Sequence, residues 1–131
     1  MLDKILCIDD DPITLMLCKM VITKASFSNE ITTAKNGEEA IKYFDTLKTT
    51  DTSKKPQLIF LDLNMPVMDG WEFLDCFSSP AYSEFHDIKV IILSSTIDPE
   101  DLKKSKKYSM VIDFFSKPIS KEMLEFLKDK I

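Results

Sequence analysis

The chain has 131 residues, of which 44% are hydrophobic and 30% charged, and its formal net charge at pH 7 is −5. This length fits one domain with a full hydrophobic core. The excess of acidic residues argues against a protein whose main function is to bind nucleic acid. Its 3 cysteines are widely spaced among apolar residues, which is typical of reduced core thiols and predicts a cytoplasmic location.

The chain opens with a predicted strand followed by a predicted helix. The strand spans residues 4–9, because its apolar run is too short for a helix and indicates a strand buried on both faces. Pro12 suits the first turn of a helix, and apolar residues recur at helical spacing from there to about Lys24. The apolar stripe of this helix consists of Ile13, Met16, Leu17, Met20 and Val21.

Strands and helices then alternate to the end of the chain, which predicts an α/β fold with a doubly wound, five-stranded parallel sheet and helices on both faces. Asp98 and Ser120 are expected to cap two of the helices. The polar residues 49–55 predict a surface loop. The predicted strands are residues 31–34, 58–62, 90–93 and 111–115, and the predicted helices are residues 38–47, 71–77, a segment opening at 98–101, and 121–131.

Charged and hydroxyl side chains follow the predicted strands at their carboxyl ends, where this architecture binds ligands. Asp9 ends the first strand and Asp10 follows it, Asp62 ends the third, Ser94 directly follows the fourth, and Lys117 follows the fifth. Like charges gather in this way where a cation or a phosphoryl group holds them. A carboxylate can attack a phosphoryl group, while a lysine and a hydroxyl neutralise its charge. The sequence therefore predicts a phosphoryl-transfer site in which the protein itself is the acceptor.

Four motifs in fixed order support this prediction, and no one of them is specific alone. With them the chain resembles the receiver domains of two-component response regulators over residues 4–128. The resemblance implies the flavodoxin-like strand order 2-1-3-4-5 and a single receiver domain over residues 1–131 without an output domain. The motifs are Ile8-Asp9-Asp10-Asp11-Pro12, Asp62-Leu63-Asn64-Met65-Pro66 with Asp69-Gly70, Ile92-Leu93-Ser94-Ser95, and Lys117-Pro118.

The resemblance implies that Asp62 is the phosphoacceptor. Asp9 and Asp10 would bind Mg²⁺ (or Mn²⁺) together with Asp62 and the backbone carbonyl of Asn64. The phosphodonor would be a phosphohistidine on a sensor histidine kinase or a histidine phosphotransfer protein. The domain would assist its own phosphorylation and dephosphorylation without being an enzyme that turns over a substrate.

The resemblance also implies a conformational switch. The Ser94 hydroxyl would bond the phosphoryl group, Lys117 would pair with the phosphoryl group or with Asp62, and Phe114 would be the aromatic switch residue. Ser95 stands where the family often has alanine. The signal would leave through the face of helix 4, strand 5 and helix 5, or by onward phosphotransfer. We expect a protein partner, no nucleic acid, no membrane insertion, and a monomer or weak dimer.

Three alternatives share the fold class. A phosphorylation-independent interaction module with the receiver fold is the main one. A phosphatase with an aspartyl nucleophile is less favoured, because such enzymes usually have a second aspartate where this chain has Asn64. A flavin-type cofactor binder is disfavoured, since the acidic residues after the first strand would repel a phosphate.

Other residues have simple structural interpretations. Asp11 is interpreted as a helix-start charge rather than a metal ligand, and His86 as a surface histidine. Trp71, Phe73 and Phe77 are interpreted as packing residues. A basic run on the fourth helix is interpreted as a solvated face or, less favoured, as a docking patch for an acidic partner. This run consists of Lys103, Lys104, Lys106 and Lys107.

The first helix carries more apolar surface than one packed face needs, because Leu15, Cys18 and Ile22 add to its stripe. Part of this surface is expected to dock a helical phosphodonor; the alternative is a helix buried between two neighbours. A charge at Leu15 is expected to separate the two, since docking predicts lost transfer with retained folding.

Overall fold

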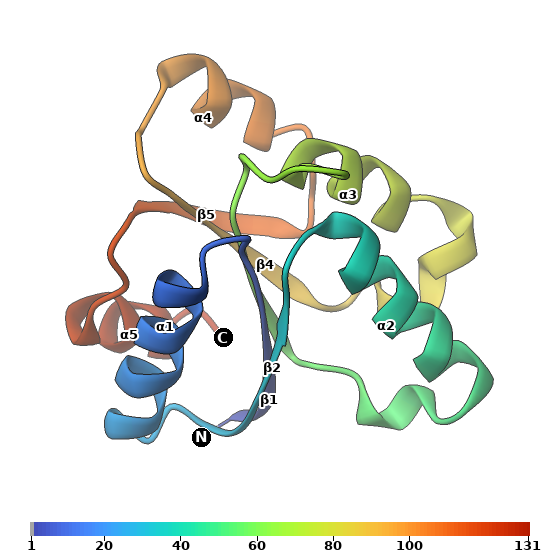
Figure 1. Ribbon diagram of the computed structural model, residues 1–131, viewed down its shortest axis with the longest axis horizontal. Helices are drawn as coiled ribbons and strands as arrows, with labels where there is room; N and C mark the ends of the chain where they lie inside the picture. Colours follow the sequence, from blue (N-terminus) through green and yellow to red (C-terminus); the bar gives the residue numbers. More distant parts are fainter. Residues whose placement is uncertain (1) are drawn as a thin grey trace.

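A computed structural model describes residues 2–131, in which five strands form one parallel sheet in the order β2-β1-β3-β4-β5 (Figure 1). This order confirms the predicted doubly wound, flavodoxin-like fold. The strands are β1 (Leu2–Ile8), β2 (Ser28–Ala34), β3 (Leu58–Leu61), β4 (Lys89–Ser94) and β5 (Val111–Ser116). The α-helices are α1 (Pro12–Lys24), α2 (Gly37–Thr49), α3 (Gly70–Phe77), α4 (Pro99–Ser105) and α5 (Lys121–Lys128).

Helices cover both faces of the sheet, with α1 and α5 on one side and α2 and α3 on the other (Figure 1). Each strand contributes side chains to the core on both faces of the sheet, because successive side chains point to opposite faces. In β1, Leu6 and Ile8 join the core under α2 and α3, whereas Ile5 and Cys7 join the core under α1 and α5. None of the helices in residues 2–131 is long and apolar enough to cross a membrane.

The boundaries differ from the predictions at polar segments. β2 begins at Ser28 rather than at residue 31, because pairing with β1 extends the strand through polar residues that carry no apolar pattern. Short 3₁₀ helices occupy η1 (Thr52–Lys54), within the predicted loop, and η2 (Pro80–Phe85). Helix α5 ends at Lys128, short of the predicted end at residue 131.

Helix α1 has the predicted bounds but turns four of the five residues of its apolar stripe outward, while the fifth, Val21, is half-buried against the core. Cys18 and Ile22 are buried and Leu15 is half-buried, so the face that was expected to be surplus is the packed one. Periodicity could not decide between two apolar faces on one helix. The exposed stripe consists of Ile13 (62% exposed), Met16 (53%), Leu17 (38%) and Met20 (59%).

Candidate functional site

Three carboxylates meet at the carboxyl ends of β1 and β3. Asp9 and Asp62 each follow a strand directly, and the register that pairs Ile8 with Leu61 places them side by side. The Asp62 N–H donates to the Ile8 carbonyl at 2.9 Å, which fixes the backbone at this point. One oxygen from each of Asp9, Asp10 and Asp62 lies within 4.8 Å of the others. Asp9 and Asp62 are buried, whereas Asp10 is exposed at the rim.

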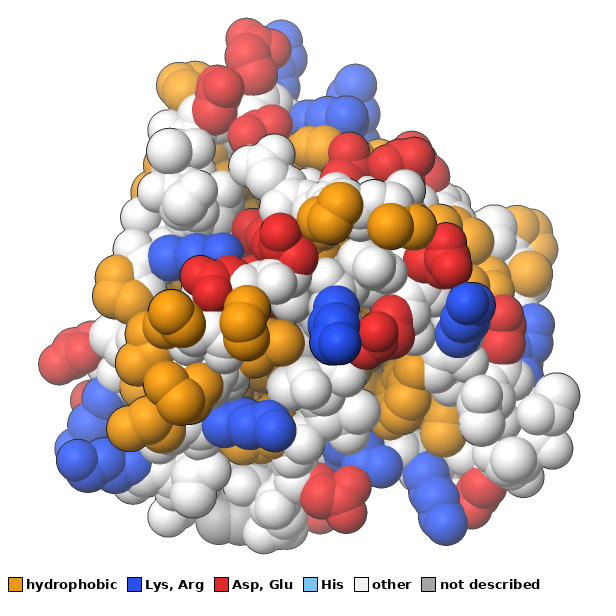
Figure 2. All heavy atoms as spheres, in the orientation of Figure 1, with side chains coloured by type: hydrophobic (Ala, Val, Ile, Leu, Met, Phe, Trp, Pro, Cys, Tyr) orange, Lys and Arg blue, Asp and Glu red, His pale blue; other side chains and the backbone are white. Residues whose placement is uncertain are grey.

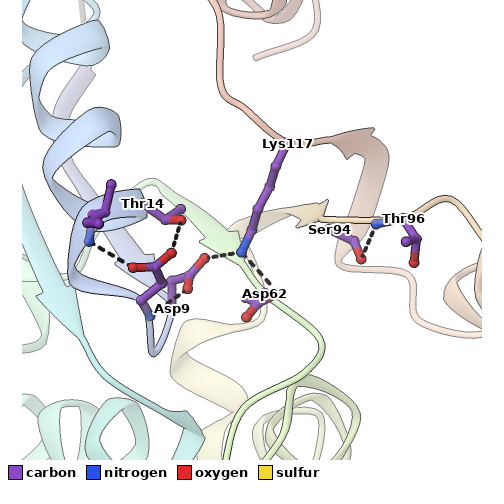
Figure 3. Close-up of polar contacts among 8 residues, drawn as sticks. Asp9, Thr14, Asp62, Ser94, Thr96 and Lys117 are labelled. Carbon is purple, nitrogen blue, oxygen red and sulfur yellow. Dashed lines mark hydrogen bonds and ion pairs between the residues drawn. The ribbon is translucent and has the colours of Figure 1, made fainter.

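Lys117 reaches this cluster from the end of β5, after which the Lys117–Pro118 peptide bond is cis. Its Nζ atom lies 2.6 Å from Asp9 Oδ2 and 3.5 Å from Asp62 Oδ1 (Figure 3). Asp62 was an expected partner, but Asp9 is the closer one. Side-chain reach set this preference, and a motif in the sequence carries no information about it.

Burial and charge together shift the acid–base properties of the site. Burial, together with the charges of Asp9 and Asp10, raises the pKa of Asp62 to about 6 against the opposing effect of Lys117. Burial alone would lower the pKa of Lys117, but its hydrogen bond and charge contact with Asp9, aided by Asp62, raise it instead. Lys117 is therefore cationic at pH 7, and Asp62 is ionised in most molecules.

Asp11 belongs to the start of α1. Its side chain accepts from the Ile13 N–H at 2.9 Å and from the Thr14 hydroxyl at 3.2 Å, which is N-cap geometry. Its own N–H donates to Asp9 Oδ1 at 2.9 Å and so helps to orient that carboxylate. The interpretation as a helix-start residue is confirmed.

The expected switch residues lie on β4 and β5. Ser94 is 1% exposed, and its hydroxyl lies 3.5 Å from the Thr96 N–H, on the side away from Asp62 (Figure 3). The Ser94 carbonyl accepts from the Lys117 N–H at 2.7 Å, which ties the two loops together. Phe114 is half-buried on β5, paired with Ile92 of β4.

The loop after β3 has a backbone feature that the sequence interpretation missed. Val67 has a φ of 71°, and Met68 donates its N–H to the Pro66 carbonyl at 2.9 Å, so the three residues form a tight turn. A β-branched residue resists this conformation, so the Val67 backbone is strained. Pro66, the first residue of the turn, and Gly70, two residues after it, were the only signals of this turn in the sequence.

The donor set suits a divalent cation of the Mg²⁺ type. Mg²⁺ prefers oxygen ligands and is commonly held by one or two carboxylates plus phosphate oxygens and waters. Asp9, Asp10 and Asp62 supply carboxylate oxygens close enough together to share one ion. Asn64 lies two residues after Asp62 with its side chain exposed.

The remaining singled-out residues lie outside the acidic cluster. Phe73 and Phe77 are fully buried, as their interpretation as packing residues predicts. His86 is exposed, and its Nε2 atom lies 2.9 Å from the Phe77 carbonyl oxygen. All four lysines of the basic run are exposed, but α4 ends at Ser105, so only Lys103 and Lys104 lie on the helix as predicted. Lys104 also contacts the ring of Trp71.

Comparison with known proteins gives a consistent family. The family model for the response regulator receiver domain matches residues 5–127. A crystal structure of a two-component response regulator from Cytophaga hutchinsonii is 32% identical, with a TM-score of 0.89, and covers 98% of this chain and 96% of that chain. The structure of the phosphorylated cyanobacterial phytochrome response regulator RcpA is 26% identical, with a TM-score of 0.75, and covers 98% of this chain and 90% of that chain.

Among curated proteins, the probable C4-dicarboxylate response regulator DctR of Halalkalibacterium halodurans is 29% identical over 122 residues. That match covers 93% of this chain but 48% of DctR. The nitrate/nitrite response regulator NarL of Escherichia coli is 33% identical over 79% of this chain and 43% of NarL. The chain thus spans less than half the length of these two relatives.

Proposed function

The chain belongs to the response regulator receiver domains, the phosphoacceptor signalling domains of two-component systems, and we propose that Asp62 is its phosphoacceptor. The observation that carries the proposal is the position of Asp62: it is buried at a strand end, between two further carboxylates and a lysine. A buried carboxylate held between a cation-binding pair and a lysine is suited to attack a charged phosphoryl group.

In the proposed reaction an Asp62 carboxylate oxygen attacks the phosphorus of a phosphohistidine. A P–O bond forms while the P–N bond breaks, and the electron pair of that bond stays with the imidazole nitrogen, which then takes a proton from solvent. Lys117 neutralises charge on the transferred group, and it must move only a short way from Asp9 and Asp62 to do so.

Asp9, Asp10 and Asp62 would hold Mg²⁺ (or Mn²⁺), with the backbone carbonyl of Asn64 as a further ligand. When bound, the ion supplies positive charge for the phosphoryl oxygens. Asp9 would then exchange part of its contact with Lys117 for the ion, which leaves the lysine free for the phosphoryl group.

The exposed apolar stripe of α1 supports a docking surface for the phosphodonor. Figure 2 shows apolar side chains gathered over α1 beside acidic side chains. We propose that a sensor histidine kinase or histidine phosphotransfer protein packs a helix against this stripe. Leu15 is half-buried, so a charge that tests docking without disturbing the fold is better placed at Met16, which is 53% exposed. Met16→Glu is expected to leave folding intact and to slow transfer from a protein donor but not from a small acyl phosphate.

The proposed output is a change of shape. The Ser94 hydroxyl would turn from Thr96 toward the phosphoryl group, and Phe114 would follow, so that the face formed by α4, β5 and α5 changes. This face would bind a protein partner, or Asp62 would pass the phosphoryl group onward. The acidic composition supports a protein partner rather than nucleic acid, and we further propose a cytoplasmic location and a monomer or weak dimer.

Intact-mass measurement after incubation with Mg²⁺ and a small acyl phosphate tests the proposal. We expect one added phosphoryl group in the wild type, and none without Mg²⁺ or in Asp62→Asn. An adduct that persists in Asp62→Asn would contradict the assignment of the acceptor. A wild type without any adduct would favour the phosphorylation-independent interaction module.

A further inference from the structure

Trp71, the only tryptophan of the chain, joins α3 to α4. The Nζ atom of Lys104 on α4 lies 4.6 Å from the centroid of the Trp71 ring. The ring of Tyr108, just beyond α4, stacks on Trp71 with centroids 5.9 Å apart and planes 26° apart. The Tyr108 hydroxyl donates to Asp75 Oδ1 at 2.5 Å, one turn further along α3. We refer to Trp71, Asp75, Lys104 and Tyr108 as the α3–α4 clasp.

Helix α4 has few other attachments to the body of the protein. Of its 7 residues only Ser105 is buried, so the helix adds little apolar area to the core. The ribbon shows α4 raised at the top of the molecule, next to α3 (Figure 1). Side-chain contacts of the clasp therefore contribute a large share of what holds α4 in position.

The tyrosine–aspartate contact of the clasp is stable at ordinary pH. Burial, aided by the hydrogen bond to Asp75 and its charge, raises the pKa of Tyr108 to about 12. The hydroxyl therefore remains protonated and can donate to the carboxylate throughout the physiological range.

Helix α4 also follows closely on the proposed switch residue. Strand β4 ends at Ser94, and only residues 95–98 separate it from the first residue of α4. Phosphorylation would turn the Ser94 hydroxyl away from Thr96, so this short connection would move with it. A short connection transmits movement to the helix that follows it. The clasp lies at the other end of α4, where Lys104 and Tyr108 contact α3.

We propose that the α3–α4 clasp sets the threshold of the switch: it stabilises the resting position of α4 and must open when Asp62 is phosphorylated. The inference rests on the function proposed above. By linkage, weakening a contact that exists only in the resting state favours the activated state, so any ligand that prefers the activated state binds more tightly.

The chain contains a matched control for this idea. Lys48 Nζ lies 4.8 Å over the ring of Tyr82, and the Tyr82 hydroxyl donates to Asp45 Oδ1 at 2.8 Å. These residues join α2 to η2 and have no part in α4. The control cluster thus has the same chemistry, a lysine over an aromatic ring and a tyrosine bonded to an aspartate, away from the switch.

The experiment measures the affinity for beryllofluoride, a phosphoryl mimic, by calorimetry in the presence of Mg²⁺, while Trp71 fluorescence follows the clasp. We expect Lys104→Met and Tyr108→Phe each to tighten binding about two- to tenfold, the size expected from losing one cation–π contact or one hydrogen bond. Lys48→Met and Tyr82→Phe should bind like the wild type, as should Lys103→Met, whose lysine is exposed near Lys104. Wild-type binding should also change the Trp71 emission.

The outcomes separate the two proposals. If the wild type binds but the clasp variants bind no more tightly than the control variants, the clasp does not set the threshold. Unchanged Trp71 emission on binding would overturn it as well, because the clasp would then stay closed in the activated state. If the wild type fails to bind, the function proposed for Asp62 is contradicted, and the clasp has no switch to control.

Discussion

At the scale of single residues, Asp62 is held in a state that costs stability. Its pKa is about 6 in the folded protein against an ordinary value of 3.8, so folding disfavours its charged form. The folded state binds the proton more tightly, so the contribution of Asp62 to stability is fully present below about pH 4, falls as the pH rises from 4 to 6, and stays at its lowest value above 6. Since one pKa unit corresponds to about 1.4 kcal/mol, the cost at pH 7 is at most about 3 kcal/mol.

We therefore predict that Asp62→Asn stabilises the metal-free protein at pH 7 by about 1 to 3 kcal/mol, because the amide removes the charge and keeps the shape. The gain should shrink as the pH is lowered from 6 toward 4 and disappear below the ordinary value of 3.8, where Asp62 is protonated in both states. Urea unfolding at several pH values without Mg²⁺ measures the difference. A variant that is no more stable than the wild type at pH 7 would show that Asp62 is not strained by burial and like charge.

Val67 is a second strained residue, and its strain lies in the backbone. With a φ of 71° and 71% exposure, its side chain gains little from packing that could offset the strain. Asparagine tolerates this conformation, so Val67→Asn should raise the free energy of unfolding by about 1 kcal/mol. Ile97→Asn is the control, because Ile97 is also exposed (51%) but is not among the residues with positive φ. Equal effects of the two substitutions would contradict the strain.

At the scale of elements, the start of α3 is fitted against the end of β3. A Cβ atom on Gly70 would lie 2.5 Å from the Asp62 carbonyl oxygen and 2.9 Å from Leu63 Cα, and both are backbone atoms that cannot turn aside. A Cβ on Gly37 would lie 2.7 Å from Met68 Cγ, on a flexible side chain, and 3.0 Å from the Met68 carbonyl oxygen, so its backbone contact is looser than those at Gly70. The close approach at Gly70 therefore fixes the position of Asp62, and the one at Gly37 is more forgiving.

Gly70→Ala is accordingly predicted to cost about 2 to 3 kcal/mol of stability through overpacking. It should also slow phosphorylation by a small acyl phosphate, because α3 can only make room by displacing Asp62. Gly37→Ala should cost clearly less and leave the phosphorylation rate near that of the wild type. Chemical denaturation and intact-mass time courses measure the two effects, and a similar loss in both variants would overturn the argument.

Elements whose burial is complete could be predicted from the sequence, and elements placed by their neighbours could not. The central strands were predicted closely, because strands buried on both faces are continuous apolar runs that end where a charge begins. Helix α1 was placed correctly but rotated wrongly, because both of its faces are apolar and only the sheet decides which one packs. The edge strand β2 was predicted short, since its polar start at Ser28 is fixed by pairing with β1 rather than by burial.

Within the site, the positions of Asp9, Asp62 and Lys117 followed from parallel strands that end at one edge. The closer contact of Lys117 with Asp9 did not follow, because it depends on a side-chain conformation. The clasp was equally out of reach. Trp71 and Tyr108 are 37 positions apart in the sequence numbering, and only the folded chain brings their rings together.

At the scale of the whole molecule, the sheet gathers like charges that the folded protein must tolerate. Three carboxylates lie within 4.8 Å of one another in a chain that already carries a net charge of −5, and Lys117 neutralises only part of them. A divalent cation that binds the folded site but not the unfolded chain should therefore stabilise the protein, by about 1.4 kcal/mol at ten times its dissociation constant.

We predict that Mg²⁺ raises the Tm at pH 7 and does so less at pH 5, where Asp62, with a pKa of about 6, must first lose a proton. Asp10→Asn should abolish most of this response while changing the metal-free stability by less than about 0.5 kcal/mol, because Asp10 is exposed. Asp11→Asn is the matched control, because it removes one negative charge at the adjacent residue and asparagine caps α1 equally well. The response of the Tm to Mg²⁺ should survive in this variant. A Tm that responds to Mg²⁺ equally in both variants would mean that the ion binds through general charge rather than at the ends of β1 and β3.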